Sequence, residues 1–363
     1  MWTYWNPTRI IFGAGAVVGI GDAIKGRRYV IVTYDQPLFK VMADRIVAAA
    51  GKPAGIIDNV VTNPDYKALT EASALFAKAG QVECIVALGG GSIIDEAKVL
   101  AAGGGDFGRV RQFLETGDGA DGLSAIPIVA VPTTAGTGSE VTCWATVWDT
   151  ENNKKYSLAR PNLYPESALI DPDLTIPLPR GLTVSTGLDA LSHALESIWN
   201  LNANPVSSSH AVAASREALA VLPLLADDLG NPGLRARMAR AAMMAGLAFS
   251  NTKTALAHSL SYPITLRHGV PHGVACSFSL PMVMRWVMDA NADCDASLKA
   301  IFGDDLRAGA DRLQAMIESL GVGTTPGDHG VADTEWKDLV QDALAGERGR
   351  NFLGDSNSVL NSL

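Results

Sequence analysis

The sequence predicts an α/β domain built on a parallel sheet, followed by an all-α domain. In the first half, short β-branched apolar runs alternate with helical stretches. From about Leu182 onward the chain is rich in Ala, Leu, Met and Ser, in long periodic stretches. Its 363 residues also exceed the size at which a single core usually stops growing. We therefore expect two domains, residues 1–178 and 179–363.

The first domain is expected to consist of βαβ units. Apolar strands are predicted within 27–35, 53–60, 82–91 and 125–134, and helices over 37–51 and 68–80. Continuous apolar strands separated by amphipathic helices are typical of a parallel sheet covered on both faces. In the second domain, helices are predicted over 208–229 and 235–250. No alternating pattern typical of a strand is found in that half of the sequence.

The composition describes a well-packed globular protein. Hydrophobic residues make up 47% and charged residues 18%, and the net charge of −9 disfavours nucleic acid as a partner. The first fifteen residues lack the charged-then-apolar order of a signal peptide, and no run reaches the length of a membrane span. A cytoplasmic protein without a membrane partner is expected. The cysteines form no CxxC pair and are predicted to be packed, reduced thiols: Cys84, Cys143, Cys276 and Cys294.

A glycine-rich turn lies between an apolar strand and a helix in segment 84–98. It places Gly89, Gly90, Gly91 and Ser92 where the backbone can approach a ligand closely. Free N–H groups at the start of the following helix attract an anion such as a pyrophosphate. The segment matches neither GxGxxG nor GxxxxGK[ST], and the alternative is a plain strand-to-helix turn.

A second segment, 131–142, also follows a strand and carries hydroxyl groups among glycines. Thr133, Thr134, Thr137 and Ser139 suit sugar and phosphate oxygens, although the segment alone could be a surface turn.

Two further residues are candidates for the same ligand. Asp35 follows the first predicted strand, where a carboxylate accepts hydrogen bonds from an adenosine ribose and repels a 2′-phosphate; alternatively it caps a turn. Lys155 is a candidate ribose or nicotinamide contact, with a solvated lysine as the alternative.

Four residues of the second half have the chemistry of a metal site. Asp189 and His193 are four apart on a helix-forming stretch and so point the same way, and His258 and His272 follow downstream. One carboxylate and three imidazoles suit Fe²⁺, Zn²⁺, Co²⁺ or Ni²⁺ better than Mg²⁺ or Ca²⁺. The Asp–His pair alone could be a polar couple on a helix.

Several motifs in order resemble the iron-dependent, or group III, alcohol dehydrogenase family. They are segments 89–98, 132–142, 171–175, 187–196 and 258–273, and the resemblance runs from 6–15 to about Pro281. It implies a Rossmann-like dinucleotide-binding domain, a helical metal-binding domain and a dehydroquinate synthase-like architecture. A homodimer is also implied.

The resemblance implies a set of site residues. The implied metal ligands, for Fe²⁺ or for Zn²⁺ or another divalent ion in its place, are Asp189, His193, His258 and His272. The implied contacts to NAD(H) or NADP(H) are Asn63, Gly91, Ser92, Asp95, Thr133, Thr134, Thr137 and Lys155. Either Tyr34 or Asp35 matches the aspartate that selects NAD in the family, so the choice between NADH and NADPH stays open.

One position departs from the family. Members commonly carry a histidine four residues after the third metal ligand, and here that residue is Tyr262. Its phenol is a candidate proton relay; the alternative is an aromatic pocket wall.

Segment 258–281 resembles the branch of the family that reduces phosphonoacetaldehyde to 2-hydroxyethylphosphonate. A phosphonate requires nearby cations, and Arg267 and His268 lie between two implied ligands in the sequence. Arg160 and Lys253 are further candidates.

The expected function is therefore that of a metal-dependent, NAD(P)-linked alcohol dehydrogenase or aldehyde reductase acting on a small molecule. The resemblance implies hydride transfer from the nicotinamide to a carbonyl polarised by the metal. One alternative is a general short-chain alcohol or aldehyde dehydrogenase with an apolar pocket. Others are a Zn²⁺-dependent relative acting on a polyol or sugar phosphate, and a catalytically silent metal- or nucleotide-binding protein.

Overall fold

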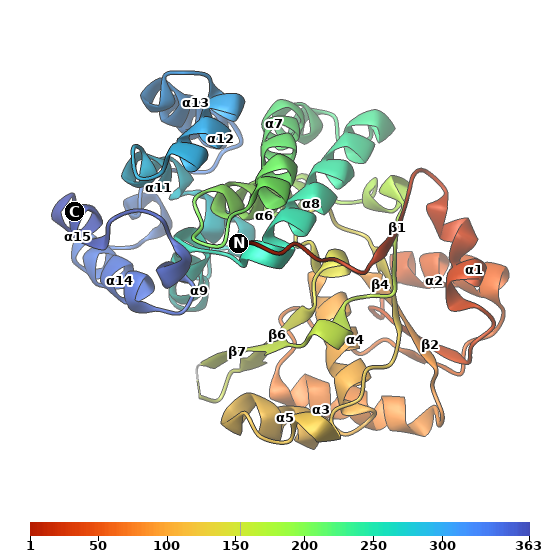
Figure 1. The fold of residues 1–363 in the computed structure, drawn as a ribbon. Coiled ribbons are helices and arrows are strands. Elements are labelled where there is room, and N and C mark those ends of the chain that lie inside the picture. The colour runs from red at the N-terminus through yellow and green to blue at the C-terminus, as the bar shows by residue number, and fades with distance from the viewer. Residues whose placement is uncertain (153) are drawn as a thin grey trace. The chain divides into compact units, whose positions relative to one another are not determined.

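The structure, a computed structural model, describes residues 1–152 and 154–363. Its contacts divide the chain into two compact units (Figure 1). The sheet unit comprises Asn6–Thr134 and Ser139–Thr175. The helical unit comprises Met1–Trp5, Ala135–Gly138 and Ile176–Leu363. Each unit has its own core and is described separately.

The sheet unit is built on six parallel strands, and the predicted α/β class is confirmed. In spatial order they are β1 (Arg9–Phe12), β8 (Ser167–Ile170), β5 (Ile128–Pro132), β4 (Cys84–Gly89), β2 (Tyr29–Val32) and β3 (Gly55–Ile57). The central strands β2, β4 and β5 are buried along their whole lengths, because helices cover both faces of the sheet.

Strand β4 shows how the two faces are filled. Ile85 and Ala87 belong to the apolar core of one face, and Val86 and Leu88 belong to that of the other. On the first face pack α3 (Tyr66–Lys78), α4 (Gly91–Gly103) and α5 (Phe107–Thr116). On the second pack α1 (Ile20–Ile24) and α2 (Pro37–Ala50).

Several elements of this unit were not predicted from the sequence, including α1, α5, two strands and a hairpin. Strands β1 and β8 form one end of the sheet, and each has only four residues. The antiparallel hairpin of β6 (Trp144–Asp149) and β7 (Lys154–Ala159) packs its Ala145, Val147 and Leu158 into the core of the first face. Strands β1 and β7 are partly exposed and lack the continuous apolar run that marks the buried central strands, so pairing with neighbouring strands decides them.

The helical unit contains the remaining α-helices, and its predicted helical character is confirmed. They are α6 (Arg180–Ile198), α7 (Pro205–Asp227), α8 (Pro232–Thr252), α9 (Leu256–His268), α10 (His272–Ser277), α11 (Leu280–Val287), α12 (Ala292–Phe302), α13 (Leu306–Ser319), α14 (Asp333–Ala345) and α15 (Ser356–Asn361). Its described residues form no extended strand, only a single bridge between Asn200 and Phe352.

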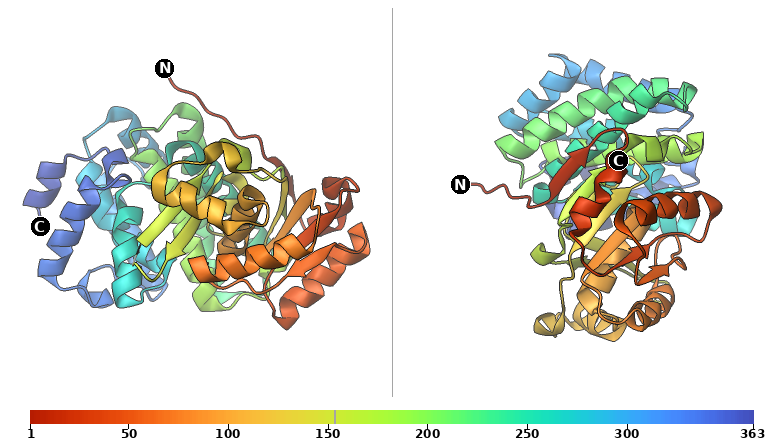
Figure 2. Two further views of the ribbon diagram at one scale, coloured as in Figure 1. Left: turned by 90° about the horizontal axis from the view of Figure 1, so that it is seen from below. Right: turned by 90° about the vertical axis from the view of Figure 1, so that its right-hand side faces the viewer.

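The two longest helices of this unit, α7 and α8, lie side by side (Figure 2). The side chain of Asn204 caps α7 by accepting hydrogen bonds from the backbone N–H groups of Val206 and Ser207. Within the described ranges, no helix combines the length and apolarity needed to cross a lipid bilayer.

Candidate nucleotide turn and metal centre

The glycine turn after β4 has the geometry predicted for an anion-binding loop. The N-cap of α4 is Gly90, which has no side chain to satisfy the first N–H groups of the helix. A Cβ atom on Gly89 would lie 2.3 Å from Cγ1 of Ile93, and one on Gly90 would lie 3.2 Å from Oγ1 of Thr134. Close packing therefore requires glycine here, and the turn lies at the carboxyl ends of β4 and β5.

Two predicted contact residues lie against this turn. The backbone N–H of Asn63 donates to Oγ of Ser92 at 3.2 Å, and Asn63 adopts a left-handed φ of 58° that asparagine tolerates. Burial raises the pKa of Tyr34, whose hydroxyl also bonds to the Ser92 side chain. Tyr34, not Asp35, thus touches the turn.

Asp95 holds the following loop in place. Its carboxylate accepts hydrogen bonds from Oγ of Ser139 at 2.6 Å and from the N–H of Thr146 at 2.9 Å. Thr133 is buried, and its N–H donates to the carbonyl of Gly89 at 3.1 Å. These predicted residues therefore form a connected group around the ends of β4 and β5.

The other predicted nucleotide contacts have different surroundings. Asp35 is exposed and pairs with Lys40 at 2.5 Å. Nζ of Lys155 lies 5.6 Å from the centre of the Trp148 ring, on the hairpin. Thr137 lies in Ala135–Gly138, which groups with the helical unit.

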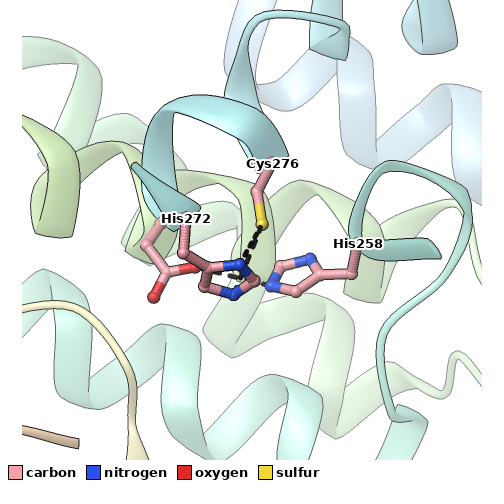
Figure 3. A group of neighbouring side chains, drawn as sticks. His258, His272 and Cys276 are labelled. Atoms are coloured by element: carbon pink, nitrogen blue, oxygen red, sulfur yellow. Dashed lines mark hydrogen bonds and ion pairs between the residues drawn. The ribbon is translucent and has the colours of Figure 1, made fainter. Parts of the chain in front are cut away.

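The metal cluster is assembled by three helices of the helical unit. Asp189 lies on α6, His258 on α9, and His272 and Cys276 on α10. One ligand atom from each residue lies within 4.8 Å of all the others. Nε2 of His258 is 3.4 Å from Oδ1 of Asp189. Figure 3 shows His258, His272 and Cys276 converging on one point.

A close approach of α10 to α6 makes this convergence possible. A Cβ atom on Gly273 would lie 1.9 Å from the backbone carbonyl oxygen of Ser185. Because Gly273 follows His272 directly, its missing side chain lets α10 bring that histidine toward Asp189.

His193 lies at the edge of this cluster. Its Nε2 is 3.9 Å from Oδ1 of Asp189, and its ring stacks between those of Phe249 and His258, with centroid distances of 4.0 Å and 4.5 Å. Burial lowers the pKa of His193 to about 4, so the imidazole is neutral and suited to bind a metal at neutral pH.

The cluster fits a divalent metal ion. Oδ1 of Asp189, Nε2 of His258 and Nδ1 of His193 are buried and make no hydrogen bond of good geometry among the described residues, although the first two lie 3.4 Å apart. Such atoms are costly to bury unless a ligand satisfies them. Burial opposes ionisation of Asp189, yet the imidazoles around it hold its pKa well below the usual range.

Glu196 orients His258 through the ring nitrogen that faces away from Asp189. Its carboxylate pairs with Nδ1 of His258 and accepts a hydrogen bond from the His258 backbone N–H at 3.2 Å. This leaves Nε2 of the imidazole directed at Asp189, an arrangement typical of histidine metal ligands.

Tyr262 lies one turn after His258 and beside the cluster. Its ring stacks on that of His272, with centroids 6.0 Å apart and planes at 7°. The Cζ atom of Arg348 lies 5.6 Å from the centre of the Tyr262 ring. Nη1 of the same side chain donates a hydrogen bond to Oγ1 of Thr254 at 2.7 Å.

The cations that the sequence analysis proposed for phosphonate binding either pair with acidic side chains or lie in the sheet unit. Arg267 and His268 both pair with Glu335, at 3.5 Å and 3.1 Å, and Lys253 pairs with Glu347 at 3.5 Å. Arg160 lies in the sheet unit, where its Nη1 is buried without a hydrogen-bond partner among the described residues.

Three residues of the site were not predicted from the sequence: Cys276, Glu196 and Arg348. The i, i+4 spacing that linked Asp189 to His193 also links His272 to Cys276, so that signal was present. Glu196 likewise lies one turn after His193. Arg348 is far along the chain from every motif, and no local pattern connects it to the cluster.

Two family models together match most of the chain. Residues 7–172 match the model described as iron-containing alcohol dehydrogenase. Residues 183–353 match the model for the C-terminal part of the Fe-containing alcohol dehydrogenase family.

Individual relatives match over most of their length. Phosphonoacetaldehyde reductase of Streptomyces viridochromogenes is 34% identical over 311 residues, covering 80% of this chain and 77% of the relative. NAD-dependent methanol dehydrogenase of Bacillus methanolicus is 28% identical, covering 95% and 93%. Among solved structures, sulfoacetaldehyde reductase from Bifidobacterium kashiwanohense in complex with NAD⁺ has a TM-score of 0.91 and 29% identity, covering 100% of this chain and 97% of that one.

Proposed function

The chain belongs to the iron-containing alcohol dehydrogenase family, and from this premise we propose that it reduces phosphonoacetaldehyde to 2-hydroxyethylphosphonate. The observation that carries the substrate proposal is the stack of Arg348 on Tyr262 and of Tyr262 on His272. Through this stack, a single aromatic ring separates the Arg348 guanidinium from His272. Two of the relatives are named for two-carbon aldehydes that bear a phosphonate or a sulfonate.

We propose Asp189, His193, His258 and His272 as the residues that hold the metal. When bound, a divalent ion such as Fe²⁺ supplies Lewis acidity that polarises the aldehyde carbonyl, and NAD(P)H supplies the hydride. The low pKa of Asp189 keeps its carboxylate charged, and Glu196 keeps the free nitrogen of His258 directed into the cluster.

We propose that Phe249 excludes water from the site and that Tyr262 supplies a proton. The Phe249 ring covers one face of His193. Reduction of an aldehyde requires a hydride at carbon and a proton at oxygen. We propose that the hydroxyl of Tyr262 holds this proton, because its ring lies beside His272 in the position where other family members carry a histidine.

The proposed nicotinamide nucleotide contacts are those predicted from the sequence. They comprise the turn, the hydroxyls around it, one amide and three charged side chains: Gly90, Gly91, Ser92, Asn63, Asp95, Thr133, Thr134, Thr137, Ser139, Lys155 and Asp35. The turn belongs to the sheet unit and the metal cluster to the helical unit, and the reaction needs both.

We propose Arg348 as the group that binds the phosphonate. Arg267 and His268, proposed from the sequence for this role, share Glu335, which offsets their charge. Arg348 is half-buried, and it contacts a neutral hydroxyl, that of Thr254, and the aromatic ring of Tyr262. A planar guanidinium also matches the geometry of a tetrahedral oxyanion.

The test of the function is steady-state oxidation of NADH and of NADPH by the Fe²⁺-reconstituted protein. Phosphonoacetaldehyde is compared with propanal, an uncharged aldehyde of similar size. We expect kcat/KM to be at least tenfold higher for the phosphonate. Equal or faster turnover of propanal indicates a general aldehyde reductase instead, and no oxidation of either nucleotide by metal-loaded protein indicates a silent binding protein.

Replacing Arg348 by methionine tests the anion site. Loss of a charge-assisted contact of about 1.5–3 kcal/mol should raise KM for phosphonoacetaldehyde at least tenfold and leave KM for propanal unchanged. The matched control is Arg350→Met, since Arg350 is exposed and bonds to the carbonyl of Ala345. Equal losses with both aldehydes would assign Arg348 a structural role only.

A further inference from the structure

We propose that Cys276 is a ligand of the metal ion, in addition to the aspartate and histidines. The inference rests on the proposed metal centre. It concerns a residue that the family resemblance does not place among the ligands, and it gives the site a sulfur donor.

The distances around Cys276 match those of a shared ion. Its Sγ lies 3.6 Å from Nε2 and 3.7 Å from Nδ1 of His272. With Zn–S near 2.3 Å and Zn–N near 2.0 Å, two donors on one ion lie about 3.0–3.6 Å apart at ordinary coordination angles. For a nitrogen and a carboxylate oxygen, both bound at about 2.0–2.2 Å, the corresponding separation is about 2.8–3.5 Å, and the 3.4 Å between Nε2 of His258 and Oδ1 of Asp189 lies within it.

The surroundings of Cys276 also differ from those of the chain's other core thiols. Cys84 and Cys294 belong to hydrophobic cores. Cys276 is fully buried, yet it lies within 4.8 Å of the ligand atoms of a carboxylate and two imidazoles. Two of those atoms, on Asp189 and His258, are buried and make no hydrogen bond of good geometry among the described residues. A metal ion satisfies these atoms and the sulfur together.

The helix geometry fixes the sulfur in this position. Cys276 lies one turn after His272 on α10, so the two side chains project from the same face. Figure 3 shows the Cys276 sulfur directed at the His272 ring. Gly273, between them, seats α10 against Ser185 of α6 and so brings both side chains toward Asp189.

A sulfur donor changes what the site binds. Coordination displaces the thiol proton to solvent and leaves a thiolate, a soft ligand that favours Zn²⁺, Co²⁺ or Fe²⁺ over Mg²⁺ and Mn²⁺. His193 lies outside the group of four that share the 4.8 Å limit. We therefore expect Cys276 to bind the ion at least as closely as His193 does.

Cobalt substitution tests the proposal without relying on turnover. The full-length protein is reconstituted with Co²⁺, its cobalt content is measured, and its absorption spectrum is recorded. We expect visible ligand-field bands together with a near-ultraviolet sulfur-to-cobalt charge-transfer band. Cys276→Ser should keep the visible bands and lose the near-ultraviolet band. The control Cys294→Ser, in the hydrophobic core of the same unit, and His193→Ala should both keep the near-ultraviolet band.

The outcomes separate this inference from the proposed function. Visible bands without a near-ultraviolet band in the unaltered protein would overturn the assignment of Cys276, as would a near-ultraviolet band that persists in Cys276→Ser. The metal centre would survive either result. If the protein takes up no cobalt, the metal centre itself fails, and the ligand assignment fails with it.

Discussion

At the scale of single residues, the side chains of the proposed metal cluster set one another's orientation and pKa. Glu196 fixes the orientation of His258, the neighbouring imidazoles lower the pKa of Asp189, and burial lowers the pKa of His193. The sequence identified the aspartate and the histidines through helical spacing and motif order. It did not identify Glu196, because a glutamate in a helix is usually a solvated residue.

Tyr262 provides a residue-scale prediction about proton transfer. Tyr262→Phe keeps the ring that stacks on His272 and removes only the hydroxyl. If that hydroxyl supplies the proton, kcat for aldehyde reduction should fall at least tenfold while KM changes little. Stopped-flow measurement of NADH oxidation gives the rate of the chemical step. A rate close to that of the unaltered enzyme would make Tyr262 a wall of the pocket.

Glu96 provides a prediction about pH and stability. It is fully buried on α4, both of its carboxylate oxygens lack hydrogen-bond partners among the described residues, and burial raises its pKa from 4.5 to about 8. Between those values the folded state keeps a proton that the unfolded state has lost. Glu96 should therefore make the protein less stable as pH rises from about 4.5 to about 8.

Glu96→Gln removes this ionisation and should raise the free energy of unfolding at pH 9 by a few kcal/mol, because each unit of pKa difference corresponds to about 1.4 kcal/mol. Its effect at pH 4.5 should be small. Urea unfolding at the two pH values measures the difference, with Glu71→Gln on the exposed face of α3 as the control. An equal effect at both pH values would mean that Glu96 ionises normally in the folded protein.

At the scale of elements, the site depends on how closely short helices approach one another. Helix α10 has only six residues and could not hold His272 and Cys276 in place alone. It is held by packing against α6 and α9. The sequence predicted the long helices well, because their periodicity extends over several turns, but such a short helix carries no comparable signal.

Gly273 provides the element-scale prediction. In Gly273→Ala, the added methyl group would lie 1.9 Å from a backbone oxygen, so α10 must move away from α6. We expect a loss of stability of about 1–3 kcal/mol and a metal affinity at least tenfold lower. Calorimetry and competition with a chromophoric chelator measure the two quantities. Gly181→Ala is the control, since a Cβ at Gly181 meets no atom within 4 Å; equal effects of the two variants would contradict the prediction.

At the scale of the whole molecule, the residues proposed for nucleotide binding and those proposed for metal binding belong mainly to different units. The glycine turn and its hydroxyls belong to the sheet unit, and the metal cluster belongs to the helical unit. The matched family models, 7–172 and 183–353, follow the same order along the chain. Loss of the metal should therefore leave nucleotide affinity nearly intact.

Metal removal tests this separation. Because an ion bound only by the folded state stabilises it, chelation should lower the unfolding temperature by at least about 5 °C, and added Co²⁺ should restore it. The dissociation constant of NADH, measured by fluorescence, should change less than twofold. His272→Ala should unfold at the same temperature with and without chelator. A metal-independent unfolding temperature in the unaltered protein would contradict the proposed centre.

The fold class, the family and the main ligand candidates could all be predicted from the amino-acid sequence. Strand and helix periodicity, the strand–glycine–helix order and the spacing of Asp189 and His193 are all local patterns, and local patterns are written directly in a sequence. Tertiary structure alone decided that Cys276 and Glu196 join the cluster and that Arg348 lies over Tyr262. It also added β1, β8 and the hairpin. The physical reason is that these contacts depend on distances between elements, and packing such as that of Gly273 on Ser185 sets those distances.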